Sequence, residues 1–185
     1  MQPEFDMEQA ADALARVVGG ITEAQLDEPT PCSDFTVRQL LAHTSDAVDA
    51  LRRLAAREQV SAPSKELPAD WRDLIPTQLK GLVIAWREPA AWDGDVEVFG
   101  GTRPASAWAR IALDELVVHG WDLAVATGQQ FDCAPSDLEV LQGWWQNVPA
   151  EGMPGMFAPA VPVPDDASAL DRVIARSGRS PSWQA

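Results

Sequence analysis

The residues in this chain that could do chemistry are a carboxylate and an imidazole one helical turn apart. Glu115 and His119 lie within residues 113–125, a stretch that is apolar on nearly every side. Side chains at positions i and i+4 project from the same face of a helix. Polar groups in a buried helix are costly unless something pairs them, and a divalent metal ion would pair both.

The second histidine of the chain, His43, lies on the edge of the apolar stripe of another amphipathic segment. We therefore expect its side chain to face inward or nearly so. Two histidines and one carboxylate leave coordination positions open, which is typical of a catalytic rather than a structural metal site. If their two helices meet inside a bundle, His43, Glu115 and His119 are candidate ligands of a metal site.

Each of these residues also has an explanation that needs no metal. A single buried histidine commonly donates to a backbone carbonyl, and chance matches of short motifs are frequent. Asp122, three residues beyond His119, could orient the imidazole from behind, bind water on the metal, or make a helix-terminal or interhelical hydrogen bond. Asp46, one turn after His43, has the same alternatives. From the pattern alone, a metal site and a hydrogen-bonded network both stay open.

Helical periodicity predicts the elements that position these residues. We expect four principal helices, over residues 5–18, 37–57, 70–87 and 104–127, with Thr36 as an N-cap and Gly128 as a stop. Two shorter helices follow, one with Ser136 as its N-cap and one over residues 168–175. Residues 95–99 alternate as a strand does, but they are few and adjoin two glycines, so we interpret them as an extended connection.

This pattern predicts an all-α fold, a four-helix bundle with a long crossover between the third and fourth helices and short C-terminal helices. A chain of 185 residues is most simply one domain. We expect residues 1–185 to form it, with 149–185 as a proline-rich extension packed on the bundle. Residues 152–164 show no periodicity, so the sequence leaves open whether they cover a pocket at the site.

Composition excludes several classes of partner. The net charge of −14 argues against nucleic acid and anionic membranes, because both require a basic surface. No apolar run is long enough to cross a bilayer, and the first residues lack the pattern of a signal peptide, so we expect a cytoplasmic protein. The sequence does not fix the oligomeric state, and a homodimer is compatible with it.

The remaining motifs carry little chemistry. Cys32 and Cys133 are too few for a disulfide framework, and we interpret them as reduced thiols packed as small hydrophobes, with a nucleophilic role as the alternative. The eight tryptophans are mainly core residues, although Trp121 could form the wall of a substrate pocket. Residues 100–102 are not a phosphate-binding loop, and no serine nucleophile elbow is present.

Two longer motifs resemble a known family. Residues 30–43 (TPCSDFTVRQLLAH) and 115–124 (ELVVHGWDLA) are similar to the metal-binding-domain family related to mycothiol-dependent maleylpyruvate isomerase, in the DinB-like (YfiT-like) superfamily. Residues 157–164, 170–172 and 178–179, with Pro181 and Trp183, resemble its single-domain actinobacterial members. The similarity thus covers almost the whole chain. Phe35 is a minor departure, since many relatives have tryptophan there.

The resemblance implies a divalent ion bound by His43, Glu115 and His119, with zinc as the first choice and nickel or iron as alternatives. It also implies mycothiol as a cosubstrate. It does not carry over isomerase activity, because the isomerase itself has a further C-terminal domain that helps form its active site. Too few residues follow Trp145 here for such a domain, so we expect the likeness to the isomerase to be confined to the bundle.

The leading hypothesis is therefore a metal-dependent enzyme, a mycothiol-type S-transferase or isomerase acting on a small electrophile. The metal would lower the pKa of the bound thiol, and the thiolate would attack the electrophile in a pocket at the end of the bundle. Activation of a water molecule is a variant that uses the same ligands. The alternatives are a metal-containing module that binds a ligand without turnover, and a hydrogen-bonded core network that binds no metal.

Overall fold

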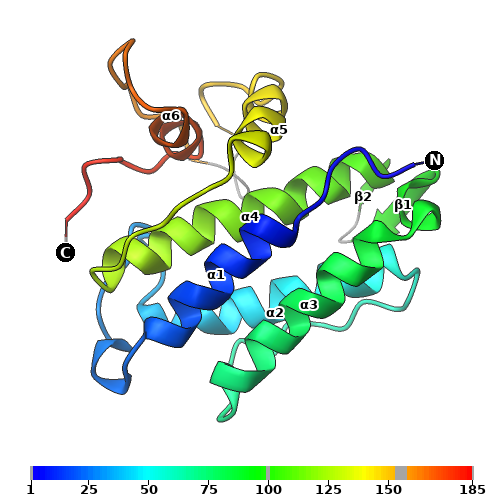
Figure 1. Ribbon diagram of the computed structural model, residues 1–185, viewed down its shortest axis with the longest axis horizontal. Coiled ribbons are helices and arrows are strands. Elements are labelled where there is room, and N and C mark those ends of the chain that lie inside the picture. Colours follow the sequence, from blue (N-terminus) through cyan, green and yellow to red (C-terminus); the bar gives the residue numbers. More distant parts are fainter. Residues whose placement is uncertain (1, 99–100, 153–157, 185) are drawn as a thin grey trace.

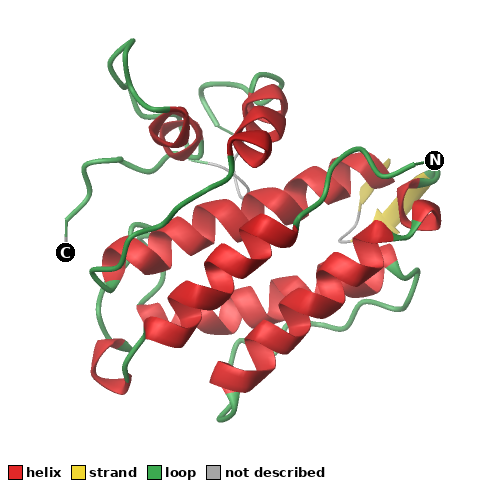
Figure 2. Ribbon diagram, viewed as in Figure 1, coloured by secondary structure: helices red, strands yellow, loops and turns green. Residues whose placement is uncertain are grey.

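A computed structural model describes residues 2–98, 101–152 and 158–184, and nearly all of its regular structure is helical (Figures 1 and 2). The principal helices are α1 (Glu8–Gly20), α2 (Val37–Ala55), α3 (Trp71–Arg87) and α4 (Ala105–Ala126). Packing joins α1 to α3 and α4, and α2 to the same two helices. The predicted all-α class is thus confirmed, and none of the described helices is long and apolar enough to span a membrane.

Local sequence signals set the ends of the helices that carry the candidate site. The Thr36 side chain accepts a hydrogen bond from the backbone N–H of Gln39, and Gln39 reciprocates, which completes a capping box at the start of α2. After α4, Gly128 takes a backbone φ of +70°, the left-handed conformation that suits glycine at a helix end. Both signals were predicted from the sequence, and they set the start of the helix that carries His43 and the end of the helix that carries Glu115 and His119.

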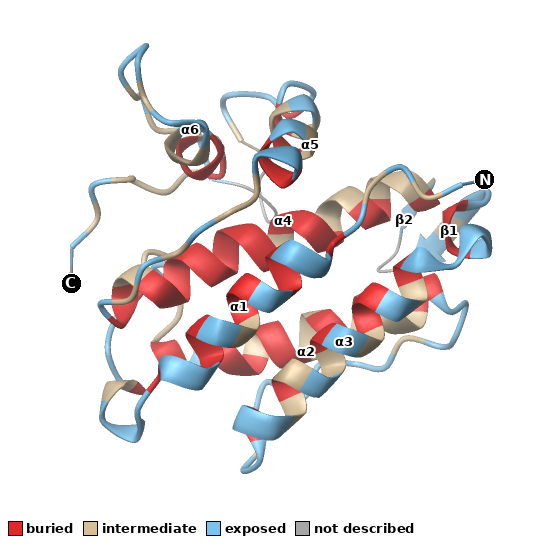
Figure 3. Cartoon of the chain, in the orientation of Figure 1, coloured by how far each residue is buried: buried red, intermediate tan, exposed pale blue. Residues whose placement is uncertain are grey.

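Helix α4 is the central element of the fold. Most of its residues are buried on every side of the helix, as Figure 3 shows. Helices α1 and α2 cover one part of its circumference, and α5 (Pro135–Trp145) packs against another. Helix α6 (Ala169–Arg176) packs against α5, and its Ile174 contacts Val118 and Trp121 of α4. Asp114, His119 and Asp122 of α4 therefore lie in the interior, while Glu115 is partly exposed.

The crossover between α3 and α4 holds a short hairpin that the sequence interpretation missed. Strand β1 (Asp95–Val98) pairs antiparallel with β2 (Gly101–Pro104), with Val96 opposite Arg103. The interpretation of residues 95–98 as a simple extended connection is therefore wrong, while Phe99 lies outside the described residues. A 3-10 turn, η2 (Pro89–Trp92), precedes the hairpin, and another, η1 (Glu23–Gln25), follows α1.

The start of one shorter helix differs from the predicted elements. Helix α5 begins at Pro135 with Ala134 before it, so Ser136 is inside the first turn and is not the N-cap. Helix α3 contains Pro76 and begins at Trp71, one residue after the predicted start. By contrast, Ser168 caps α6 as expected, because its side chain accepts from the backbone N–H of Asp171. The different start of α5 leaves the candidate site unchanged.

Candidate metal centre

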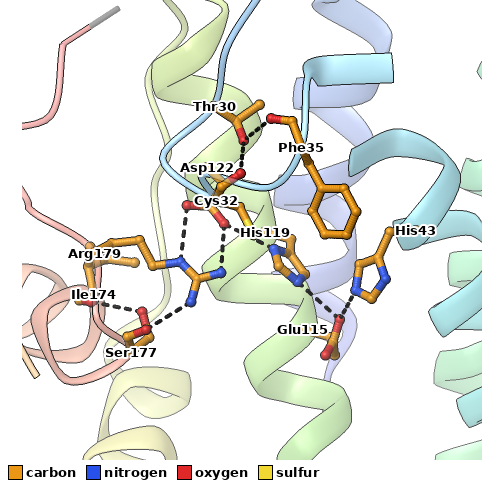
Figure 4. A network of polar contacts seen from close by, with 10 residues as sticks. All are labelled: Thr30, Cys32, Phe35, His43, Glu115, His119, Asp122, Ile174, Ser177 and Arg179. Carbon is orange, nitrogen blue, oxygen red and sulfur yellow. Dashed lines mark hydrogen bonds and ion pairs between the residues drawn. The ribbon is translucent and has the colours of Figure 1, made fainter. Parts of the chain in front are cut away.

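His43 of α2 and the Glu115–His119 pair of α4 meet at one point, where His119 is buried and the other two side chains are partly exposed (Figure 4). Glu115 Oε2 lies 3.2 Å from His43 Nε2 and 3.3 Å from His119 Nε2. Two ligands that each sit about 2 Å from a tetrahedral zinc ion are roughly 3.3 Å apart. All three ligand atoms lie within 4.8 Å of one another. The spacing and the donor types fit a divalent ion with one coordination position or more left open.

Neighbouring aromatic groups hold the two imidazoles in place. Phe35 stacks on His43, with ring centroids 5.4 Å apart and planes 20° from parallel. The His43 and His119 rings meet edge to face at 5.0 Å. At the next position of α4, a Cβ atom at Gly120 would lie 2.5 Å from the Phe131 ring, so glycine permits that close approach. Packing thus fixes the rotation of α4 and the direction of His119.

A second carboxylate stands behind His119. Asp122 has no exposed surface, and its Oδ2 is 3.0 Å from His119 Nδ1. Because an ionised carboxylate only accepts, Nδ1 must carry the proton and Nε2 is the nitrogen directed to Glu115. Imidazole ligands of metals are commonly oriented in this way. Of the roles weighed for Asp122 from the sequence, this geometry supports the orientation of His119.

Sequence reasoning missed the partner on the far side of Asp122. Arg179, which follows α6, donates from Nη2 to Asp122 Oδ2 at 3.2 Å and from Nε to Oδ1 at 3.4 Å. Its side chain is 15% exposed, so this is a mostly buried ion pair. The available signal was Asp122 itself, since a buried carboxylate beside one imidazole still has acceptor capacity for a cation.

Charges at the centre shift the pKa values of three residues in the protein without bound metal. Burial disfavours the His119 imidazolium, but the Glu115 and Asp122 carboxylates outweigh burial and raise its pKa to about 9. Burial likewise disfavours the Glu115 carboxylate, yet both histidines hold its pKa well below the usual range. The pKa of Asp114 rises to about 7 because it is buried and adjoins Glu115. The proton on His119 Nε2 is the one that a metal ion must displace.

Asp46 and the cysteines have less direct positions. Asp46 Oδ2 accepts from the backbone N–H of Lys65 at 2.8 Å, which matches its hydrogen-bond alternative. Cys32 Sγ lies within 4.8 Å of atoms of both His119 and Asp122, although the two residues are far from it in sequence. Burial raises the pKa of the Cys32 thiol, and burial raises that of Cys133 to about 12, so both are protonated thiols packed against the core.

Two cavities open at the centre, one on either side of Glu115. The first, of about 600 Å³, extends between α2, α4 and the β1–β2 hairpin and is mainly apolar. The second, of about 670 Å³, extends toward the C-terminal segment and includes Cys32, Ser33, Asp34 and Arg179. Trp121 lines neither cavity and packs with Val118 and Ile174, as a core tryptophan does.

Comparison with known proteins places the chain in a family. The family model described as mycothiol maleylpyruvate isomerase N-terminal domain matches residues 7–124, which include every predicted metal ligand. The chain belongs to this family. Two curated relatives, both described as uncharacterized proteins of Mycobacterium tuberculosis (strains H37Rv and CDC 1551), are 30% identical over 97% of this chain and 99% of their own. The family assignment made from the two motifs is confirmed.

Solved structures extend the similarity beyond the family domain. The crystal structure of the mycothiol-dependent maleylpyruvate isomerase matches 95% of this chain and 88% of its own, with a TM-score of 0.67 at 21% identity. A histidine-to-alanine mutant of that isomerase matches with the same TM-score at 20% identity. The expectation that the likeness is confined to the bundle is therefore wrong. The fold of this family member is shared through most of its C-terminal segment.

Proposed function

We propose that this protein is a metal-dependent enzyme that uses a low-molecular-weight thiol, with mycothiol as the first choice, to transform a small electrophile. The observation that carries the proposal is the convergence of His43 Nε2, His119 Nε2 and Glu115 Oε2 beside an open cavity. The family membership and the mycothiol dependence named for the similar isomerase structure support the choice of thiol. We propose zinc as the ion, because imidazole and carboxylate ligands with open positions suit it.

His43, Glu115 and His119 would hold the ion, which when bound lowers the pKa of a coordinated thiol and so makes a thiolate available near neutral pH. Phe35 and Asp122 orient the two imidazoles. Arg179 balances the charge of Asp122 and attaches the C-terminal segment to the centre. Because this segment completes the site, we propose that residues 1–185 act as one unit, with 149–185 packed on the bundle.

Two reactions are open to such a thiolate. In a transferase, sulfur forms a bond to carbon while the leaving group departs with its electron pair, and the thiol is consumed. In an isomerase, the thiolate adds to an activated double bond, the adduct rotates about the resulting single bond, and the thiolate is expelled again. Thiol consumption therefore separates the two reactions, and a protein that binds both ligands without turnover is a binding module only.

The metal centre is tested by elemental analysis of protein purified without added metal, together with the variants His43→Ala and His119→Ala. We expect one divalent ion per wild-type chain and a large loss of metal in both variants. Asp46→Asn is the control that should keep its metal, because the Asp46 carboxylate contacts the backbone of Lys65. Cobalt(II) substitution then reports on the thiol, since a thiolate–cobalt bond adds a charge-transfer absorption band. Substoichiometric metal in wild type, or unchanged metal in both variants, would contradict the proposal.

A further inference from the structure

The cavity between α2, α4 and the hairpin, here called the apolar chamber, differs in character from the cavity across Glu115. Most of its wall is hydrocarbon, from Ala47, Ala50 and Leu51 of α2, Trp108 and Ile111 of α4, and Val98 of β1. The centre itself forms the inner end, since His43 and Glu115 line both cavities. A molecule seated in the chamber would thus reach the metal residues from the side opposite Arg179.

Small side chains and specific hydrogen bonds define the walls of the chamber. Alanines at positions 47 and 50 of α2 leave the space that larger side chains would fill. The Trp108 indole N–H donates to the Val96 carbonyl at 3.4 Å and so ties the hairpin to α4. Asp46 holds the loop after α2 through the backbone N–H of Lys65, a residue with a φ of +61°. These contacts therefore hold α4, the hairpin and the loop after α2 in place around the chamber.

The polar groups of the wall offer little to a charged ligand. Asp46 already accepts from Lys65, and Asp114 accepts from the Trp145 indole N–H at 2.8 Å. The carboxylates of Asp46 and Glu115 disfavour entry of an anion. Arg103 of β2 contributes one half-buried cation to the wall. Burial of apolar surface is then the main source of affinity that the chamber provides.

We propose that the apolar chamber binds the electrophile of the reaction and selects uncharged, largely apolar molecules of about one or two rings. The thiol, which enters by the more polar cavity that holds Cys32 and Arg179, meets the electrophile at the centre from the other side. This assignment of the two cavities rests on the proposed function. The occupancy and selectivity of the chamber are measurable without turnover and without thiol.

The probe is 6-propionyl-2-(dimethylamino)naphthalene, a neutral fluorophore with two fused rings that brightens when it leaves water. We expect saturable binding to wild-type protein, with and without chelator, and a loss of affinity of about tenfold or more in Ala50→Phe, because the ring fills the chamber. Ala107→Phe is the matched control, since Ala107 is on α4 but lines a different surface cavity. If Ala50→Phe does not fold, Val98→Glu tests the same wall from the hairpin.

Selectivity is measured by displacement of the probe. Naphthalene should compete, while naphthalene-2,6-dicarboxylate, of the same ring size, should compete at least about tenfold more weakly. Unchanged probe binding in the folded wall variant, or equal competition by the dicarboxylate, would overturn the proposal. A normal displacement pattern in protein that gives no cobalt–thiolate band leaves the chamber assigned to an apolar ligand and rejects the proposed function alone.

Discussion

Replacing Asp122 by asparagine tests whether the carboxylate behind His119 tunes the metal centre. Asp122 is fully buried and shares one oxygen, Oδ2, between His119 Nδ1 at 3.0 Å and Arg179 Nη2 at 3.2 Å. In Asp122→Asn, the amide oxygen can still accept from His119 Nδ1 only if the NH₂ group faces Arg179 Nε. Both of those groups are donors, so no hydrogen bond forms between them. The reverse orientation sets NH₂ against His119 Nδ1. Either way, His119 loses a charged acceptor.

The magnitude follows from the role of this hydrogen bond. Loss of the carboxylate makes His119 a weaker ligand, and changes of this kind cost about 10–100-fold in metal affinity. That range corresponds to about 1.4–2.7 kcal/mol. We therefore expect the zinc dissociation constant of Asp122→Asn to rise by this factor, with the ion still bound at stoichiometric concentration.

The assay is competition for zinc against a chromophoric chelator, after circular dichroism has shown that the metal-free variant is folded. Asp46→Asn is the matched control, because it removes one carboxylate charge close to the centre without touching a metal ligand. A change of less than about threefold in Asp122→Asn, or an equal change in Asp46→Asn, would refute the reasoning, since tuning by the second carboxylate should exceed this.

Three further predictions concern stability. Removing the metal with a chelator should lower the melting temperature, because an ion present at 100 times its dissociation constant stabilises the folded state by about 2.7 kcal/mol. An unchanged melting temperature would count against the proposed metal centre. Burial raises the pKa of Asp137 to about 6 from 3.8, so the folded state holds this proton more tightly than the unfolded state and wild type loses up to about 3 kcal/mol as pH rises from 4 to 7. Asp137→Asn should lack this loss in denaturant titrations at both pH values, and an unchanged pH slope would disprove it. Gly120→Ala should cost about 1–3 kcal/mol in the same titration, since its Cβ would meet Phe131, whereas Gly143→Ala, with nothing within 4 Å, is the control that should not.

The helices were predictable because their signals are local. The capping box at Thr36 and the glycine after α4 act within a few residues, and apolar periodicity shows which face turns inward. The hairpin was missed because its second strand, Gly101–Pro104, alternates too little to read as a strand, and its proline read as the first residue of a helix. Pairing between strands is a property of both partners, whereas the interpretation weighed only β1.

In the candidate site, too, the residues that follow local patterns were predictable and those paired over long distances in the chain were not. Glu115 and His119 share a helix face by their spacing, and His43 lies on the inward edge of α2, so their meeting follows from two amphipathic patterns. Arg179 lies 57 residues from Asp122 in the chain, and no periodicity links the two. Asp114 was also overlooked, since neighbouring positions on a helix point about 100° apart and its partner, the Trp145 indole, comes from α5.

The Asp122–Arg179 pair has a consequence for the chain beyond residue 124, where the family domain ends. One carboxylate contacts both a proposed metal ligand and the C-terminal segment, so binding of the proposed ion and docking of that segment would share a free energy of coupling. Such coupling is reciprocal. By whatever factor a docked C-terminal segment tightens the hold on the ion, the ion strengthens the docking of the segment by the same factor. Under the proposed function, metal supply would act on the stability of a part of the protein that contributes no proposed ligand.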